Sequence, residues 1–294
     1  MAFVRLIKRV GRQTRRGDLA RIVSLLFLAL SLTSVFLYLL LAYYLSDDPR
    51  LVPLALRNAK SILFVTAHPD DETLFFGPSI AYRRDDPQVR RSLLAVSSGN
   101  YEGIGDLRRV ELHKSCAKLS ISRAHCAVLD RADLQDNPRQ WWNEDKVADL
   151  VTAYVRKWKV DLIITFDHGG VSGHINHRAI SAGVRADRLC PSKRPSAPQV
   201  YIAIRPYTYL PPIYWRILKA IFTTPLDDQV QRTSVHDTIP LEAYNSRALI
   251  VSPLSTYFAS RRAFQQHASQ YSWDRMLYLI MSRYMWLNNL ERVE

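Results

Sequence analysis

The chain has 294 residues, 48% of them hydrophobic, and carries a formal charge of +13. This length and apolar content suit one large α/β domain with additional segments, and the absence of internal repeats excludes repeat architectures. No basic stripe interleaved with aromatic residues stands out, so we expect no nucleic-acid partner. The three cysteines, Cys116, Cys126 and Cys190, lack metal-ligand spacing and do not form a disulfide framework; we expect them to serve packing.

The N-terminal region predicts a membrane anchor. Residues 1–21 form a basic flank with seven Lys and Arg against one Asp, and residues 22–45 contain no charge. These 24 residues span a bilayer core of about 30 Å as a helix. The run is too long for a signal peptide and no small-residue cleavage site follows it, which favours one uncleaved transmembrane helix. The basic flank predicts a cytosolic N-terminus and a domain on the opposite side.

Residues 46–60 are predicted to be a linker, and residues 61–294 to be the catalytic domain. Apolar runs bounded by polar residues predict strands, and apolar residues at helical spacing predict helices between them. The expected strands cover residues 62–67, 92–97, 127–129 and 160–166, and the expected helices cover residues 79–84, 107–119 and 142–158. This alternation predicts an α/β fold: a Rossmann-like, three-layer, doubly wound and mostly parallel sheet.

The first expected strand ends in the sequence AHPDDE, residues 67–72. Ligands of open α/β sheets bind outside the carboxyl ends of the strands. His68 and Asp71 offer an imidazole nitrogen and a carboxylate oxygen, which suit zinc or a similar divalent ion. Asp70 and Glu72 remain as candidate base and supporting residue. The alternative is an acidic helix start in which these carboxylates only cap the helix.

The strand 160–166 ends in a second polar, glycine-rich loop that contains His174 and His177. Two histidines three residues apart at a helix start can face one cavity. With His68 and Asp71 they make four candidate donors, from which a catalytic zinc can take the three protein ligands that it needs, with one position left for water. This pattern predicts a metal-dependent hydrolase.

Other polar residues near strand ends are candidates for substrate binding or for support of the loops. They are Asn100, Arg108, Glu111 and Asp167. Arg108 and Glu111 are three residues apart on a helix, so a simple surface ion pair is an equally good interpretation. His168 and His267 have no assigned role. The aromatic segments 206–222 and 273–287 are interpreted as core helices, or alternatively as surfaces against a bilayer.

The combination of AHPDDE, SSGN, RxxE and TFDxGGVSGHxNH, over residues 60–290, resembles the N-acetylglucosaminyl-phosphatidylinositol de-N-acetylase family (PIG-L/LmbE-like), close to its eukaryotic membrane-bound branch. That resemblance implies that His68, Asp71 and His177 bind the metal and that Asp70 is the general base. It implies that His174 stabilises the oxyanion or protonates the leaving amine. Bacterial relatives usually have Pro-Asp between the two histidines, where this chain has Ile175-Asn176.

The resemblance further implies removal of acetate from the glycolipid N-acetylglucosaminyl-phosphatidylinositol, in the second step of GPI-anchor synthesis at the endoplasmic reticulum. It implies a catalytic domain on the cytosolic face, which disagrees with the charge of the N-terminal flank. The alternatives are a de-N-acetylase of another amino-sugar conjugate and a non-catalytic membrane scaffold of the same fold. Zinc is the expected metal, although other divalent ions accept these ligands.

Overall fold

The computed structural model describes residues 16–185, 198–203 and 246–293. The chain divides into two compact units, Met1–Tyr44 and Leu45–Glu294. In the first unit, helix α2 (Arg16–Leu39) continues into a short π-helix, η1 (Leu40–Tyr44). Its stretch Asp18–Tyr44 has 27 residues and a mean hydropathy of 2.4, and it is the one helix among the described residues that is long and apolar enough to cross a membrane. The prediction of an N-terminal apolar helix of spanning length is confirmed.

The second unit is built on a seven-stranded sheet with the order β3-β2-β1-β4-β5-β7-β6. The five neighbouring strands β3, β2, β1, β4 and β5 are parallel to one another, and β7 is antiparallel to both β5 and β6. The strands are β1 (Ser61–Thr66), β2 (Arg90–Ala95), β3 (Cys126–Val128), β4 (Leu162–Phe166), β5 (Gln199–Ala203), β6 (Arg247–Val251) and β7 (Leu287–Arg292). The predicted mostly parallel, doubly wound α/β fold is confirmed.

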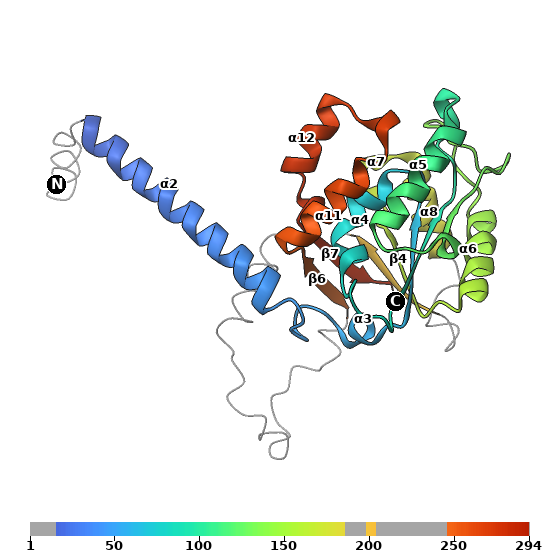
Figure 1. The fold of residues 1–294 in the computed structure, drawn as a ribbon, viewed down its shortest axis with the longest axis horizontal. Coiled ribbons are helices and arrows are strands. Elements are labelled where there is room, and N and C mark those ends of the chain that lie inside the picture. The colour runs from blue at the N-terminus through green and yellow to red at the C-terminus, as the bar shows by residue number, and fades with distance from the viewer. Residues whose placement is uncertain (1–15, 186–197, 204–245, 294) are drawn as a thin grey trace, which may run out of the picture. The chain divides into compact units, whose positions relative to one another are not determined.

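Helices lie on both faces of the sheet (Figure 1). Helices α4, α5 and α11 pack together, and α6 packs against α8. The helices of this unit are α3 (Leu54–Asn58), α4 (Asp71–Ala81), α5 (Gly105–Lys118), α6 (Glu144–Trp158), α7 (Gly170–Gly173), α8 (Ile175–Val184), α11 (Leu254–Phe264) and α12 (Trp273–Met281). Single 3₁₀ turns are η2 (Asn100–Glu102), η3 (Arg123–His125), η6 (Ala268–Gln270) and η7 (Arg283–Met285).

The central strands β1 and β4 are buried along their whole length. Their apolar and β-branched side chains face helices on both sides, as parallel strands in a three-layer fold require. From β1 the chain moves outward to β2 and β3, and it then returns to form β4 on the other side of β1. The carboxyl ends of β1 and β4 therefore meet at a topological switch point, where α/β sheets bind their ligands.

Two predictions compare with the structure in detail. The stretch predicted as a linker, residues 46–60, contains α3 and the buried Leu51 and Leu56, and the carbonyl of Leu51 accepts a hydrogen bond of 2.8 Å from Leu249 N. The interpretation of the cysteines was wrong, because Cys116 of α5 and Cys126 of β3 form a disulfide. An odd count of cysteines hides a pair that only the packing of α5 beside β3 brings together. Cys190 and the segment 206–222 lie outside the described residues.

Candidate active site

The turn after β1 presents His68, Asp70 and Asp71 from a stretch of four residues that also contains Pro69. Helix α4 begins at Asp71, so the turn ends in a rigid element. Asp71 Oδ2 accepts hydrogen bonds from the backbone N–H groups of Ala67 (3.0 Å) and His68 (2.8 Å). These two bonds fix the carboxylate and leave Oδ1 facing the second half of the site.

The second half comes from the glycine-rich loop after β4. Asp167, which is buried, accepts a hydrogen bond of 2.9 Å from the N–H of Val171 and so braces the loop. Gly170 has φ +64, and a Cβ at this position would lie 2.8 Å from His177 Cβ. Only glycine combines this backbone conformation with such a close approach. The loop leads directly into α8, which carries His177 on its first turn.

Three imidazoles meet between the two loops. Ligand nitrogens of His68, His174 and His177 all lie within 4.8 Å of one another. His177 Nδ1 lies 3.1 Å from the carbonyl oxygen of Gly170. Because a carbonyl only accepts, Nδ1 carries the proton and Nε2 has a free lone pair. That Nε2 is buried, makes no hydrogen bond to any described residue and lies 3.2 Å from Asp71 Oδ1.

His68 is oriented in the same manner. Its Nε2 lies 3.1 Å from Asp136 Oδ1 and 3.3 Å from Asn176 Oδ1, both acceptors, so Nε2 carries the proton. Its Nδ1 then offers a lone pair 3.7 Å from Asp71 Oδ2. Two unprotonated imidazole nitrogens and one fixed carboxylate, all buried, form a donor set that fits a divalent metal ion. The carboxylate of Asp136 contacts Nε2 of His68, the ring nitrogen that does not face Asp71. In metal sites, such a carboxylate orients the histidine that binds the metal.

His174 differs from the other two histidines because it caps α8. Its Nδ1 accepts a hydrogen bond of 3.3 Å from the N–H of Asn176, so the proton of the neutral ring is on Nε2. Burial and the neighbouring His68 and His177 lower the pKa of His174 to about 4. At neutral pH the side chain is therefore an uncharged donor, which suits hydrogen bonding to a developing oxyanion.

Asp70 lies on the other side of the turn, with φ of 106°. Its carboxylate is buried, and each of its oxygens lies 3.7 Å from a guanidinium, one from Arg108 and the other from Arg275. Burial and the adjacent Asp71 raise the pKa of Asp70, although the two arginines oppose this effect. A buried carboxylate with a raised pKa holds a proton more readily than a free one, which suits a general base.

Glu72 and His267 form a buried pair beneath Asp70. Glu72 Oε2 accepts a hydrogen bond of 3.0 Å from Asp70 N, while Oε1 lies 2.6 Å from both Ser115 Oγ and His267 Nε2. Both members of the pair are fully buried. The pair anchors the backbone of Asp70 in its positive-φ conformation, which is costly for a residue with a side chain.

The remaining predicted residues hold the loops in place. Arg108 donates to the carbonyls of Pro69 (2.6 Å) and Gly99 (3.1 Å), and it does not pair with Glu111. Glu111 is buried and accepts from the N–H and hydroxyl of Ser269. In the loop after β2, Asn100 Oδ1 accepts a bond of 2.8 Å from Gly105 N. His168 is exposed.

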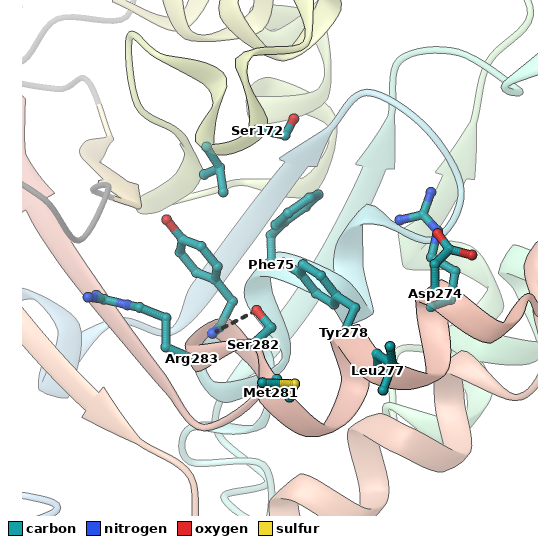
Figure 2. A pocket seen from close by; sticks show the side chains of 11 residues that line it. Phe75, Ser172, Asp274, Leu277, Tyr278, Met281, Ser282 and Arg283 are labelled. Atoms are coloured by element: carbon teal, nitrogen blue, oxygen red, sulfur yellow. Dashed lines mark hydrogen bonds between the residues drawn. The ribbon is translucent and has the colours of Figure 1, made fainter.

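A cleft of ≈ 570 Å³ adjoins the histidines. Figure 2 shows its walls: Phe75 of α4, Ser172 of the glycine-rich loop, and side chains of α12 and η7. The ring centroid of Phe75 lies 5.7 Å from that of His177. Arg275 lines the same cleft and reaches Asp70. The cleft therefore connects with the site at Phe75 and at Arg275.

The PIG-L family, described as GlcNAc-PI de-N-acetylase, matches residues 63–186, which include both loops of the site. The N-acetylglucosaminyl-phosphatidylinositol de-N-acetylase of Bos taurus is 34% identical over 230 residues, covering 78% of this chain and 81% of the relative. This chain belongs to the PIG-L family. A probable N-acetylglucosaminyl-phosphatidylinositol de-N-acetylase of Schizosaccharomyces pombe is 32% identical, over 79% of this chain and 87% of the relative.

The PIG-L fold extends to solved structures of low sequence identity. The N,N'-diacetylchitobiose deacetylase from Pyrococcus horikoshii superposes with a TM-score of 0.56 at 14% identity, covering 88% of this chain and 92% of that one. At this identity the comparison establishes the shared architecture. The family resemblance that the AHPDDE and GGVSGHxNH motifs indicate is confirmed by the relatives.

The sequence patterns did not reveal the roles of three residues of this PIG-L site, Asp136, His267 and Arg275. Asp136 follows β3, a parallel strand whose carboxyl end lies at the same edge of the sheet, and this position was an available signal. His267 follows α11 and Arg275 lies in the first turn of α12, and no local pattern connects them to residues 70–72.

Proposed function

We propose that the chain is a metal-dependent hydrolase that removes acetate from N-acetylglucosaminyl-phosphatidylinositol and yields glucosaminyl-phosphatidylinositol, a step of GPI-anchor biosynthesis. The observation that carries this proposal is the convergence of His68, Asp71 and His177 beside Asp70 at the switch point. The chain's 34% identity with a de-N-acetylase of that name supports the substrate.

In this proposal, His68 Nδ1, an oxygen of Asp71 and His177 Nε2 hold the metal, which we propose to be zinc. A zinc ion bound there polarises the amide carbonyl and lowers the pKa of a water molecule. Asp70 takes the proton of the attacking water, and its raised pKa matches this task. His174, through Nε2–H, donates to the oxyanion or to the leaving amine. Water adds to the acetyl carbon, the C–N bond breaks, and acetate and the free amine leave.

The test is acetate release from N-acetylglucosaminyl-phosphatidylinositol by the purified full chain, with and without a chelator, beside Asp70→Asn. We expect chelator-sensitive release that the substitution lowers by at least about 100-fold, since general-base catalysis contributes that much. Turnover of a soluble amino-sugar conjugate alone would retain the chemistry and refute the lipid substrate. Bound metal without turnover of either substrate would favour the non-catalytic scaffold.

We further propose that the chain resides in the endoplasmic reticulum membrane through residues 22–45, with the catalytic domain on the cytosolic face, as the family resemblance implies. The basic N-terminal flank and the Cys116–Cys126 disulfide favour the opposite face, because disulfides persist in oxidising compartments. Protease treatment of sealed microsomes decides the matter. Digestion of the domain supports our orientation, and its protection refutes it.

A further inference from the structure

The cleft beside the active site contains an arginine, Arg283, two of whose nitrogens have no acceptor among the described residues. Arg283 lines the cleft from η7, and its Nε and Nη2 are buried and make no hydrogen bond to any described residue. Its guanidinium lies 5.6 Å from the ring centroid of Tyr284, and no ion pair to it occurs in the described part of the chain. Arg283 as a whole is half-buried, but buried N–H donors without partners are costly unless an anion accepts from them.

The position of Arg283 suits a substrate that extends from the catalytic residues. Tyr284 lies 6.0 Å from Phe75 between ring centroids, and Phe75 lies 5.7 Å from His177. Successive ring contacts through Phe75 and Tyr284 thus link the histidine cluster to the guanidinium of Arg283. In Figure 2 Arg283 and Asp274 lie at opposite ends of the row of cleft residues.

The rim of the cleft is apolar and exposed. Helix α12 turns Trp273, Leu277, Ile280 and Met281 outward, a spacing that makes one helical face, and the side chains of Trp273 and Met281 are 78% and 79% exposed. The opposite face of α12 packs inward through Leu279, which is fully buried. Exposed aromatic and aliphatic residues beside arginines match the interfacial layer of a phospholipid membrane.

We propose that this cleft is the subsite for the phosphatidyl part of the substrate, with Arg283 binding the phosphodiester and the outer face of α12 against the acyl chains and bilayer. The inference rests on the proposed function, because the glycolipid is what places a phosphodiester beside the sugar. The guanidinium supplies paired N–H donors to phosphate oxygens, which a lysine supplies less well.

The first test is calorimetric binding of glycerophosphoinositol to the full chain in detergent. We expect Arg283→Gln to weaken binding by about 10- to 100-fold, the contribution of a hydrogen-bonded charge, and Arg283→Lys to weaken it less. The matched control is Arg262→Gln, since Arg262 is an exposed residue of α11 that does not line the cleft. We expect this variant to bind as the wild type does.

This measurement needs no turnover, so it is independent of the acetate-release test. Absence of binding to the wild type, or equal binding by Arg283→Gln and the wild type, overturns the phosphate subsite. Equal loss in Arg262→Gln overturns it also, since the effect would then follow from net charge. In turnover assays, the proposal requires that Arg283→Gln raise KM for the glycolipid while kcat changes less than twofold.

The second test concerns the rim. In the full chain, Trp273→Ser/Ile280→Ser should lower acetate release from glycolipid held in phosphatidylinositol-containing vesicles, while release from detergent-dispersed glycolipid stays as in the wild type. The control is Leu107→Ser/Val110→Ser on α5, where Val110 is as exposed as Ile280, at 52%. Equal release from vesicles by both variants and the wild type overturns the membrane contact of α12.

Discussion

Replacement of Asp136 by asparagine tests how the site holds its metal. In the structure His68 Nε2 lies 3.1 Å from Asp136 Oδ1, and both side chains are nearly buried, so water screens the contact little. Burial lowers the pKa of His68, but the neighbouring carboxylates of Asp136 and Asp71 outweigh this effect and raise that pKa. Asparagine retains an acceptor oxygen but removes the charge.

The expected loss follows from the role of such carboxylates. Outer-shell partners of a ligand histidine contribute about 10- to 100-fold in metal affinity. This corresponds to about 1.4 to 2.7 kcal/mol. We therefore expect Asp136→Asn to release zinc at a chelator concentration 10 to 100 times lower, and to regain most of its activity when zinc is saturating, because Asp70 and His174 are unchanged.

The assay is competition for zinc with a fluorescent chelator, followed by acetate release at saturating metal. Asp133→Asn is the matched control, because Asp133 belongs to the same loop but pairs with Arg131 and Lys146. Unchanged zinc affinity in Asp136→Asn would refute the reasoning. An equal loss in the control would refute it too, because the loop would then act through its net charge alone.

Three further predictions concern stability. His267→Ala should lower the free energy of unfolding by about 3 to 5 kcal/mol, since it leaves Glu72 buried with one partner fewer; a loss below about 1 kcal/mol in urea unfolding would contradict this. Gly170→Ala should lower the free energy of unfolding by about 1 to 2 kcal/mol, because alanine is strained at a φ of +64. It should also weaken zinc binding, because the new Cβ displaces His177. Unaltered zinc affinity would show that the loop adjusts freely. Cys116→Ala should lower the free energy of unfolding by about 3 kcal/mol, because it opens the short loop that the Cys116–Cys126 disulfide closes. The measurement is made under non-reducing conditions, and equal stability of the variant and the wild type would argue against the disulfide.

The reactive residues that the sequence identified all follow predicted strands directly. His68 and Asp71 come after β1, and His174 and His177 come after β4. Because parallel strands place their carboxyl ends at one edge, local patterns were enough to predict that these side chains meet. The apolar helix at the N-terminus could also be predicted from local sequence, since its length and the absence of charge define it.

Tertiary structure decided which residues support that centre. Asp136, His267 and Arg275 contact His68, Glu72 and Asp70 across sequence separations of 68, 195 and 205 residues. Helical spacing suggested a surface pair for Arg108 and Glu111, whereas packing directs each toward a separate partner.

The sequence by itself indicated the fold class and the membrane-length helix, and it predicted five candidate metal-site and proton-transfer positions at the strand ends: His68, Asp70, Asp71, His174 and His177. Only the folded chain showed that Nε2 of His177 makes no hydrogen bond, that Cys116 meets Cys126, and that Nε and Nη2 of Arg283 have no acceptor in the described part of the chain. The physical reason is the separation along the sequence of the residues that decide each feature. Strand and helix patterns follow from neighbouring residues, whereas tautomers, disulfides and unpaired charges depend on atoms that only long-range packing brings within 3 or 4 Å.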